Sequence, residues 1–262
     1  MTLYEFFSLL GGVGLFLYGM SIMSSGLKKA AGDKLRTILE AASIRQDFTA
    51  NVSHELKTPL TAISGYAELL ENGMVEGDQV VHVAEQIHHN SDRLLSLIND
   101  IIRLSELDHK ELSRKFAPVD LAEAAEECAG NLQVSAQKRH LTLTCQCESA
   151  VISADRDLLK ELIENLIQNA IQYNRDNGSI LVRTGMDGGR PYLSVSDTGI
   201  GIPANQQERI FERFYRVDKS RSRETGGTGL GLAIVKHIAE LHDARILVDS
   251  QPGKGTCITV QM

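Results

Sequence analysis

The chain has 262 residues, a formal net charge of −7 and four cysteines. This length allows one or two domains beyond a membrane anchor, and the acidic balance argues against nucleic acid as a partner. The cysteines show neither metal-ligand spacing nor a disulfide framework, as expected for a cytoplasmic body. Cys145 and Cys147 alternate along LTLTCQC, so both should point to one face of a strand, where packing is the simplest interpretation.

An uncharged run from Phe6 to Leu27 lies near the start of the chain. As a helix its 22 residues would span about 33 Å, enough for a bilayer core of about 30 Å. Four basic residues follow between positions 28 and 36, which favours the cytoplasmic side for the rest of the chain. We therefore expect residues 1–42 to be a single-pass anchor in the cell membrane and a linker. The alternatives are a buried Gly-rich helix and a signal peptide, although no basic n-region or A-x-A site is present.

Two long amphipathic helices should follow, one from about 36 to 73 and the other from after the turn NGMVEGD to about Leu112, because apolar residues recur at spacings of three and four. The first stripe is Phe48, Val52, Leu56, Leu60, Ile63, Ala67 and Leu70, and the second is Val80, Val83, Ile87, Leu94, Leu97, Ile101 and Leu104. Two helices cannot bury two such stripes, so we expect a homodimer in which hairpins of residues 43–113 form a four-helix bundle.

His54 lies away from the first stripe, about 200° round the helix from Leu56. Imidazole is nucleophilic near neutral pH, and the adjacent Glu55 offers a carboxylate that can accept from one ring nitrogen. Thr58 follows at i+4 on the same face, and Pro59 should bend the helix at this turn. A surface histidine alone is usually only solvated, so this motif gains meaning from the rest of the chain.

A second group of motifs lies more than a hundred residues later. DTGIGIP, residues 197–203, follows an alternating strand-like run and contains two glycines that permit a tight turn. GGTGLGLAIV, residues 226–235, is a glycine-rich loop that enters an apolar helix, a layout that presents backbone N–H groups to phosphate. The polar, basic segment between them suits a mobile lid. Upstream, Asn165 and Asn169 share one helix face and offer oxygen ligands to a hard cation.

The C-terminal half should be a two-layer α/β sandwich over residues 114–262, which makes the whole fold α+β. PVDL at 118–121 opens it, with Asp120 as the cap of a new helix. Helices are predicted at about 120–138, 155–174 and 229–242, and strands at 140–147, 179–185, 191–197, 245–250 and 256–261.

From about Arg45 to the C-terminus the chain resembles sensor histidine kinases of two-component systems, in particular the phosphate-regulon sensor kinases of Gram-positive bacteria. NVSHELKTPL resembles the phospho-acceptor box, and the later motifs resemble the Asn, Asp-Gly, Phe and Gly boxes in the same order. Single motifs of this kind are often turns or local hydrogen-bonders. The resemblance implies an ATP-dependent protein-histidine kinase that phosphorylates itself, passes the group to an aspartate of a response regulator receiver domain, and also dephosphorylates that regulator.

The resemblance assigns roles to individual residues. His54 is the implied phospho-acceptor, Glu55 its general base, and Thr58 the residue that places a water for regulator dephosphorylation. Asn169, helped by Asn165, would hold Mg²⁺ against the phosphates of ATP.

The implied adenine site centres on Asp197, which would accept from the adenine amino group. The other implied nucleotide-binding residues are Tyr173, Gly199, Gly201, Phe211, Lys219, Arg221, Gly227, Thr228, Gly229, Leu230 and Gly231. Phe214 would join Phe211 in anchoring the lid.

Two positions depart from the family pattern. Gln172 stands where the family often has Lys or Arg, so one phosphate-facing cation is missing, and lid residues Lys219, Arg221 and Arg223 are candidate replacements. His242-Asp243-Ala244 replaces His-Gly-Gly, which removes the easy left-handed glycine cap and leaves that helix boundary open.

Other interpretations remain open. Gly14 to Glu40 resembles the start of a sodium/phosphate symporter, but only its first membrane helix is present, so no transport site is expected. The chain could then be a natural fusion or a misjoined gene, and could act as a regulatory part of a phosphate transporter with a degenerate kinase domain. A third alternative is a serine kinase or ATPase of the same ATP-binding superfamily, which would not need His54.

Overall fold

The computed structural model describes residues 48–108, 115–217 and 227–262. The chain divides into two units, Met1–Glu55 and Leu56–Met262, and only residues 48–55 of the first are described. None of the described helices is both long and apolar enough to cross a membrane. The expected anchor and the symporter-like segment lie outside the described residues.

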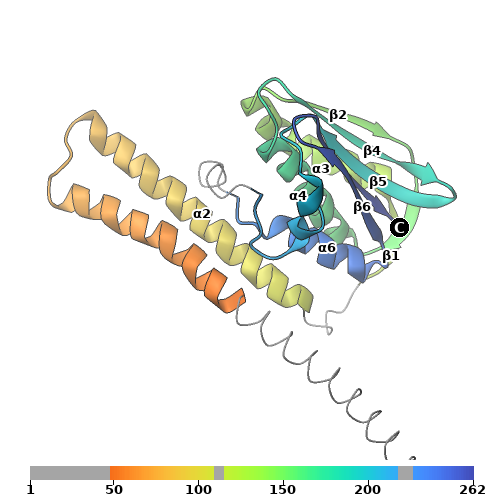
Figure 1. Cartoon of the computed structure of the whole chain (residues 1–262), viewed down its shortest axis with the longest axis horizontal. Helices are drawn as coiled ribbons and strands as arrows, with labels where there is room; N and C mark the ends of the chain where they lie inside the picture. The colour runs from red at the N-terminus through yellow and green to blue at the C-terminus, as the bar shows by residue number, and fades with distance from the viewer. Residues whose placement is uncertain (1–47, 109–114, 218–226) are drawn as a thin grey trace, which may run out of the picture. The chain divides into compact units, whose positions relative to one another are not determined.

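The helical hairpin begins with a helix that is described over residues 48–71. Gly73 and Gly77 turn the chain with φ of 61° and 57°, values that glycine adopts without a steric cost. Helix α2 (Asp78–Asp108) then follows as the second arm (Figure 1). The hairpin prediction is confirmed, and both the expected start of the first helix and the expected end of the second lie outside the described residues.

The two predicted stripes are only partly buried within one chain. Val83, Leu97 and Leu104 are buried, whereas Leu60 and Val80 are exposed. The other large apolar side chains exposed on α2 are Val81, Leu95, Ile98 and Ile102. The hairpin therefore keeps a considerable apolar surface that its own chain does not cover.

The C-terminal part is the predicted two-layer sandwich (Figure 1). Its strands are β2 (Thr142–Cys147), β4 (Ser179–Asp187), β5 (Arg190–Asp197), β6 (Arg245–Gln251) and β7 (Gly255–Gln261), in the sheet order β2-β4-β5-β7-β6. Among the described strands, only β2 and β4 pair in parallel. The helices are α3 (Leu121–Lys138), α4 (Arg156–Gln172) and α6 (Gly231–Leu241).

One face of this sheet packs on the helices. Alternate strand residues such as Ile180 and Val182 are buried, as the period of two along a strand requires. The buried side chains of α4 are mainly Leu and Ile, and the asparagines lie on its remaining surface. Cys145 does not follow the packing prediction, because it is exposed, and Cys147 is only half-buried. All four cysteines lie in the described part of the chain and are free thiols.

A small second sheet was not predicted. β1 (Ala117–Asp120) pairs antiparallel with β3 (Val151–Ala154), and neither four-residue strand alternates strictly between apolar and polar residues. The predicted cap beside them is present: Oδ1 of Asp120 accepts from the N–H of Ala122 at 2.9 Å and from that of Ala150 at 3.1 Å. Asp120 therefore starts α3 and also ties it to the loop before β3.

Helix α6 ends just before His242-Asp243-Ala244, the segment that lacks the two glycines of the family pattern. Its last residue is Leu241, and Asp243 adopts a φ of 52°, the left-handed conformation that glycine usually supplies. Aspartate tolerates this conformation better than most residues. The helix therefore stops within one residue of the predicted end without its glycine cap.

Two short 3₁₀ turns complete the fold between β5 and α6. They are η1 (Ala204–Gln206) and η2 (Arg209–Phe211), and they lie in the segment that follows the DTGIGIP motif.

Candidate functional site

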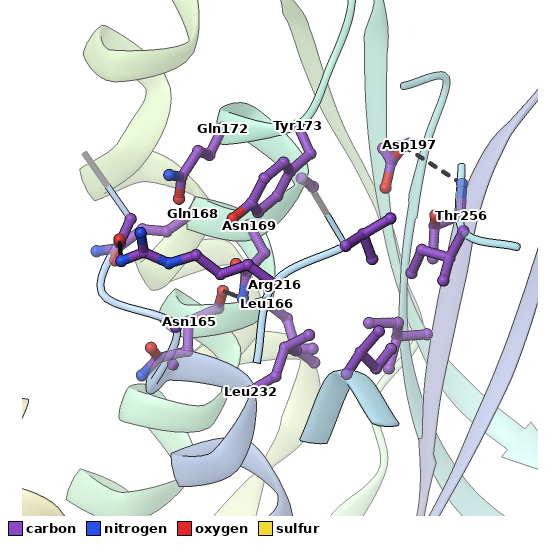
Figure 2. Close-up of a pocket in the computed structure, with 18 of the residues that line it drawn as sticks. Asn165, Leu166, Gln168, Asn169, Gln172, Tyr173, Asp197, Arg216, Leu232 and Thr256 are labelled. Atoms are coloured by element: carbon purple, nitrogen blue, oxygen red, sulfur yellow. Dashed lines mark hydrogen bonds between the residues drawn. The ribbon is translucent and has the colours of Figure 1, made fainter. Parts of the chain in front are cut away.

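A cavity of about 460 Å³ brings the distant C-terminal motifs together. In Figure 2 the labelled side chains of α4 lie on one side of it, and Asp197 and Thr256 lie on the other. The glycine-rich loop before α6 and the segment after η2 also line it, as do Ser96 and Asp100 of α2. Segments that lie far apart in the sequence thus share one cavity.

The two asparagines of α4 present their oxygens because the helix uses their amide nitrogens. Nδ2 of Asn165 donates to the carbonyl of Glu161 at 2.8 Å, and Nδ2 of Asn169 donates to that of Asn165 at 2.9 Å. A carbonyl can only accept, so the NH₂ group must face the helix and Oδ1 must point away from this bond. Both residues line the cavity, and oxygens of this kind suit Mg²⁺.

Within residues 48–108, 115–217 and 227–262, no three His, Cys, Asp or Glu side chains gather in a metal-binding arrangement. In this part of the chain, Asn165 and Asn169 are therefore the candidate metal ligands.

Asp197 is a half-buried carboxylate at the end of β5. Its Oδ1 accepts from the N–H of Gly199 at 2.7 Å and from that of Thr256 at 3.3 Å. Burial raises its pKa to about 6, and the two backbone hydrogen bonds lower it in part. Both of these bonds use Oδ1, and the residue lines the cavity, so the carboxylate is fixed in place while it faces a ligand space.

Gly199 and Gly201 are needed by the protein's own backbone. A Cβ on Gly199 would collide with the carbonyl of Tyr173, and one on Gly201, whose φ is 68°, would collide with that of Gln251. Ile200 between them donates to the Tyr173 carbonyl at 3.1 Å. Gly201 lines the cavity, but Gly199 does not. These two glycines let the DTGIGIP turn pack against α4 and β6.

The glycine-rich loop contributes Gly227, Thr228, Gly229 and Gly231 to the cavity wall. Gly229 has a φ of 74°, and its carbonyl accepts from the N–H of Phe214 at 2.9 Å. A Cβ on Gly231 would lie 2.7 Å from Oδ1 of Asn165, so any larger residue at this position would have to displace the Asn165 side chain.

Leu230 differs from its neighbours in the loop. It is fully buried and does not line the cavity, so it anchors the loop in the core.

Of the residues predicted to belong to the lid, the structure describes the two phenylalanines but not the basic residues. Phe211 in η2 is half-buried beside Ile210, which is the residue of that turn that lines the cavity. Phe214 is half-buried, with a left-handed φ of 63°. Lys219, Arg221 and Arg223 lie outside the described residues.

Arg216 was missed by sequence reasoning. It lines the cavity beside Tyr173, and its guanidinium donates to the carbonyl of Gly227 (Figure 2). Burial raises the pKa of Tyr173, and the charge of Arg216 opposes that rise. The only sequence signal for Arg216 was its place in a basic segment, which does not tell one basic residue from another.

Arg139 is the second unpredicted cation on the cavity wall. Its NH1 group donates to the carbonyls of Ile171 and Gln172, at 3.0 and 2.8 Å. It therefore satisfies the C-terminal end of α4, where a positive charge is favourable. Gln172 also lines the cavity, so two arginines stand near the position where the family often has a cation.

The phospho-acceptor motif is helical and exposed. The His54 side chain is 76% exposed, and its Nδ1 lies 3.8 Å from Oε1 of Glu55, close enough for charge interaction but not for a hydrogen bond. Thr58 is also exposed. The outward direction predicted for His54 is confirmed.

Comparison with known proteins agrees with these two groups of motifs. Residues 154–262 match the family of histidine kinase-, DNA gyrase B-, and HSP90-like ATPases, and residues 44–110 match the His Kinase A (phospho-acceptor) domain. The sensor-like histidine kinase SenX3 of Mycolicibacterium smegmatis is 42% identical over 83% of this chain and 57% of its own length. The phosphate regulon sensor protein PhoR of Pseudomonas aeruginosa is 39% identical over 82% of this chain and 49% of its own length.

Solved structures show the same fold. Histidine kinase ThkA, in complex with the response regulator protein TrrA, gives a TM-score of 0.70 over 85% of this chain and 63% of that chain, at 24% identity. Acinetobacter baumannii histidine kinase AdeS gives 0.65 over 80% of this chain and 96% of that chain, at 23% identity. The chain spans about half the length of the curated relatives it matches. It belongs to the sensor histidine kinases of two-component systems and is similar to the phosphate-regulon sensors.

Proposed function

We propose that the chain is an ATP-dependent protein-histidine kinase that phosphorylates His54 and passes the phosphoryl group to an aspartate of a response regulator. One observation carries this proposal: the α4 asparagines, Asp197 and the glycine-rich loop line one cavity. The phospho-acceptor match at residues 44–110 supports His54 as the acceptor.

The cavity residues fit a nucleotide at both of its ends. At one end the fixed carboxylate of Asp197 can accept a hydrogen bond from an exocyclic amino group such as that of adenine. At the other, Asn165 and Asn169 present neutral oxygens beside a loop of backbone N–H groups. Mg²⁺ held there would neutralise the charge that spreads over the transferred phosphoryl group.

The reaction needs one nucleophile and one leaving group. An imidazole nitrogen of His54 attacks the γ-phosphorus, an N–P bond forms, the bond from that phosphorus to the β–γ bridging oxygen breaks, and ADP leaves. Glu55 beside the ring takes up the imidazole proton. A regulator carboxylate then attacks the same phosphorus, and the N–P bond breaks.

Arg216 and Arg139 are the described cations that would face the phosphates. Both line the cavity, and both hold carbonyl oxygens at the edge of the site. Their positive charge would replace that of the basic residue that the family often has at the position of Gln172. The sequence had suggested lid residues for this role.

The proposed organisation has three parts. Residues 1–42 are a single-pass membrane anchor and linker, residues 43–113 the dimerising phosphotransfer hairpin, and residues 114–262 the ATP-binding domain with the catalytic body in the cytoplasm. The apolar side chains exposed on α2 support the dimer, and the basic residues after Leu27 support the orientation.

The test uses the full chain and ATP labelled at the γ-phosphate. We expect acid-labile, base-stable label on the wild type and none on His54→Gln, while ATP affinity stays within about threefold because His54 lies outside the cavity motifs. His88→Gln, on an exposed α2 position, is the matched control and should keep the label. Acid-stable label on His54→Gln would instead identify a serine kinase.

Thr58 is the proposed phosphatase residue. Thr58→Ala should keep autophosphorylation near the wild-type level but slow dephosphorylation of the regulator at least about tenfold, because its hydroxyl would position water. Thr61→Ala, another exposed threonine of the same helix, is the control. An equal loss of both activities in Thr58→Ala would mean that Thr58 supports the helix.

A further inference from the structure

The C-terminal part of α2 is docked on the ATP-binding domain. Leu97, Leu104 and Leu107 are at most 3% exposed, and they recur at helical spacing on one face of α2. This helix contacts α6 directly. The C-terminal part of α2, which carries residues of the predicted bundle stripe, is therefore in contact with the catalytic domain in this structure.

Two ion-pair clusters flank the docked face. Arg103 pairs with Glu161 of α4 at 2.7 Å. Asp108 pairs with Arg213 at 2.7 Å, and Nε2 of His237 in α6 lies 3.3 Å from the same carboxylate. Neither cluster lines the cavity, so both hold α2 in place from outside the proposed nucleotide site.

Asp100 makes the contact that reaches the cavity. Its Oδ2 accepts from Oγ1 of Thr228 at 2.6 Å, which links α2 to the glycine-rich loop across 128 positions of sequence. Asp100 and Thr228 both line the cavity. Burial raises the pKa of Asp100 and the Thr228 hydrogen bond lowers it, as expected for a carboxylate with little water around it.

A carboxylate at this position opposes the ligand proposed for the site. The loop that Asp100 holds is the one whose backbone N–H groups would receive phosphate. Like charges repel, and they do so more strongly in a partly buried site than in water. The Thr228 hydroxyl, which could itself donate to a phosphate oxygen, is already used by Asp100.

We propose that Asp100 makes the docking of α2 and the binding of nucleotide phosphates compete for the glycine-rich loop. The proposal rests on the ATP site proposed above. Phosphate at the loop takes the Thr228 hydroxyl and repels Asp100, and α2 leaves the catalytic domain. By thermodynamic reciprocity, any signal that pulls α2 away raises ATP affinity by the same factor by which ATP favours release.

Calorimetric titration of the full chain with ATP and Mg²⁺ tests the competition. Asp100→Asn keeps the shape and one acceptor but removes the charge, and we expect ATP to bind about three- to tenfold more tightly than to the wild type. Asp92→Asn, an exposed acid on the same helix, is the control and should bind ATP like the wild type. Melting temperatures of all variants report whether each one folds.

A second variant tests whether undocking of α2 alone, without removal of a charge from the cavity, changes ATP affinity. Asp108→Ala breaks the Arg213 and His237 contacts outside the cavity, so it should also tighten ATP binding, but by less than Asp100→Asn. Hydrogen exchange supplies the direct readout: in the wild type, amides of residues 96–108 should exchange faster once ATP is added.

Opposite results overturn the proposal. Weaker ATP binding by Asp100→Asn would mean that the carboxylate is a metal or nucleotide ligand. Unchanged affinity in both variants, with exchange at 96–108 unaffected by ATP, would mean that the interface is static. A wild type that binds no ATP would instead contradict the proposed function, so the two failures are distinguishable.

Discussion

At the scale of a single residue, Asp197 is a carboxylate of the proposed nucleotide site whose burial lowers the stability of the protein at neutral pH. Two backbone N–H groups fix its position, yet burial still raises the pKa of the carboxyl from 3.8 to about 6. The folded protein therefore holds a proton between those two values that the unfolded chain would release. This contribution to stability is complete below about pH 4 and is lost as the pH rises through 6.

Asp197→Asn should separate stability from binding. The amide oxygen can keep both backbone hydrogen bonds without a charge, so at pH 7.5 the variant should gain up to about 3 kcal/mol in free energy of unfolding, and the gain should vanish below about pH 4. ATP binding should weaken, because an amide can turn a donor toward the adenine amino group. Urea denaturation at several pH values and ATP titration measure the two effects. A variant less stable than the wild type at pH 7.5 would contradict the burial argument.

Asn169→Asp makes the reverse change, from an amide to a carboxylate, at the proposed metal site. A carboxylate cannot donate to the Asn165 carbonyl, so it loses the bond that orients the side chain and adds a charge facing phosphate. We expect at least about a hundredfold loss of Mg²⁺-dependent autophosphorylation, equivalent to roughly 3 kcal/mol. Asn131→Asp on the exposed surface of α3 is the matched control. Activity near the wild-type level in Asn169→Asp would exclude this residue from the metal site.

At the scale of elements, His242 joins two helix ends. Its Nδ1 lies 2.8 Å from the carbonyl of Ile238, so this nitrogen carries the proton, because a carbonyl only accepts. Its Nε2 then accepts from the N–H of Asp155, the cap of α4, at 3.2 Å. The ring also packs on Phe116, with centroids 5.1 Å apart. The end of α6 is thereby tied to the start of α4 and to the segment that enters the domain.

His242→Ala should lower the free energy of unfolding by about 1–3 kcal/mol, since it removes one hydrogen-bond acceptor, one donor and a ring contact. His89→Ala, at an exposed position on α2, should change it by less than about 0.5 kcal/mol. Urea denaturation followed by circular dichroism measures both. If His242→Ala unfolds like the wild type, this link between helices does not stabilise the domain.

At the scale of the whole molecule, the apolar residues left exposed on the hairpin predict the oligomer. Leu95 on α2 is 59% exposed, and Leu95→Glu should convert a dimer into a monomer, because it places a charge in the proposed bundle. Val134 on α3 is 60% exposed, and Val134→Glu is the matched control that should remain dimeric. Light scattering during gel filtration gives the mass of each. A dimeric Leu95→Glu with an unchanged dissociation constant would place the interface elsewhere.

Local patterns accounted for much of the fold and part of the site. Helical periods predicted the hairpin and α4, and the position of Asp120 before α3 predicted its cap. The pairing of β1 with β3 could not be predicted, because neither short segment alternates strictly between apolar and polar residues. Arg216 and Asp100 could not be predicted either: the path of the chain decides which lid arginine enters the cavity, and the Thr228 contact joins positions 128 residues apart.

The hydrogen bonds that Asn165 and Asn169 donate to the carbonyls of α4 also fix the distance between their side-chain oxygens. Each amide repeats the geometry of the other one helical turn later, and four residues advance an α-helix by about 6 Å. Two oxygens bound directly to one Mg²⁺ are at most about 4.2 Å apart, twice the usual metal–oxygen distance. While both amides keep their helix bonds, an ion held directly by one of these oxygens would therefore lie out of direct reach of the other. The spacing along the helix thus gives Asn165 and Asn169 different roles toward a metal ion.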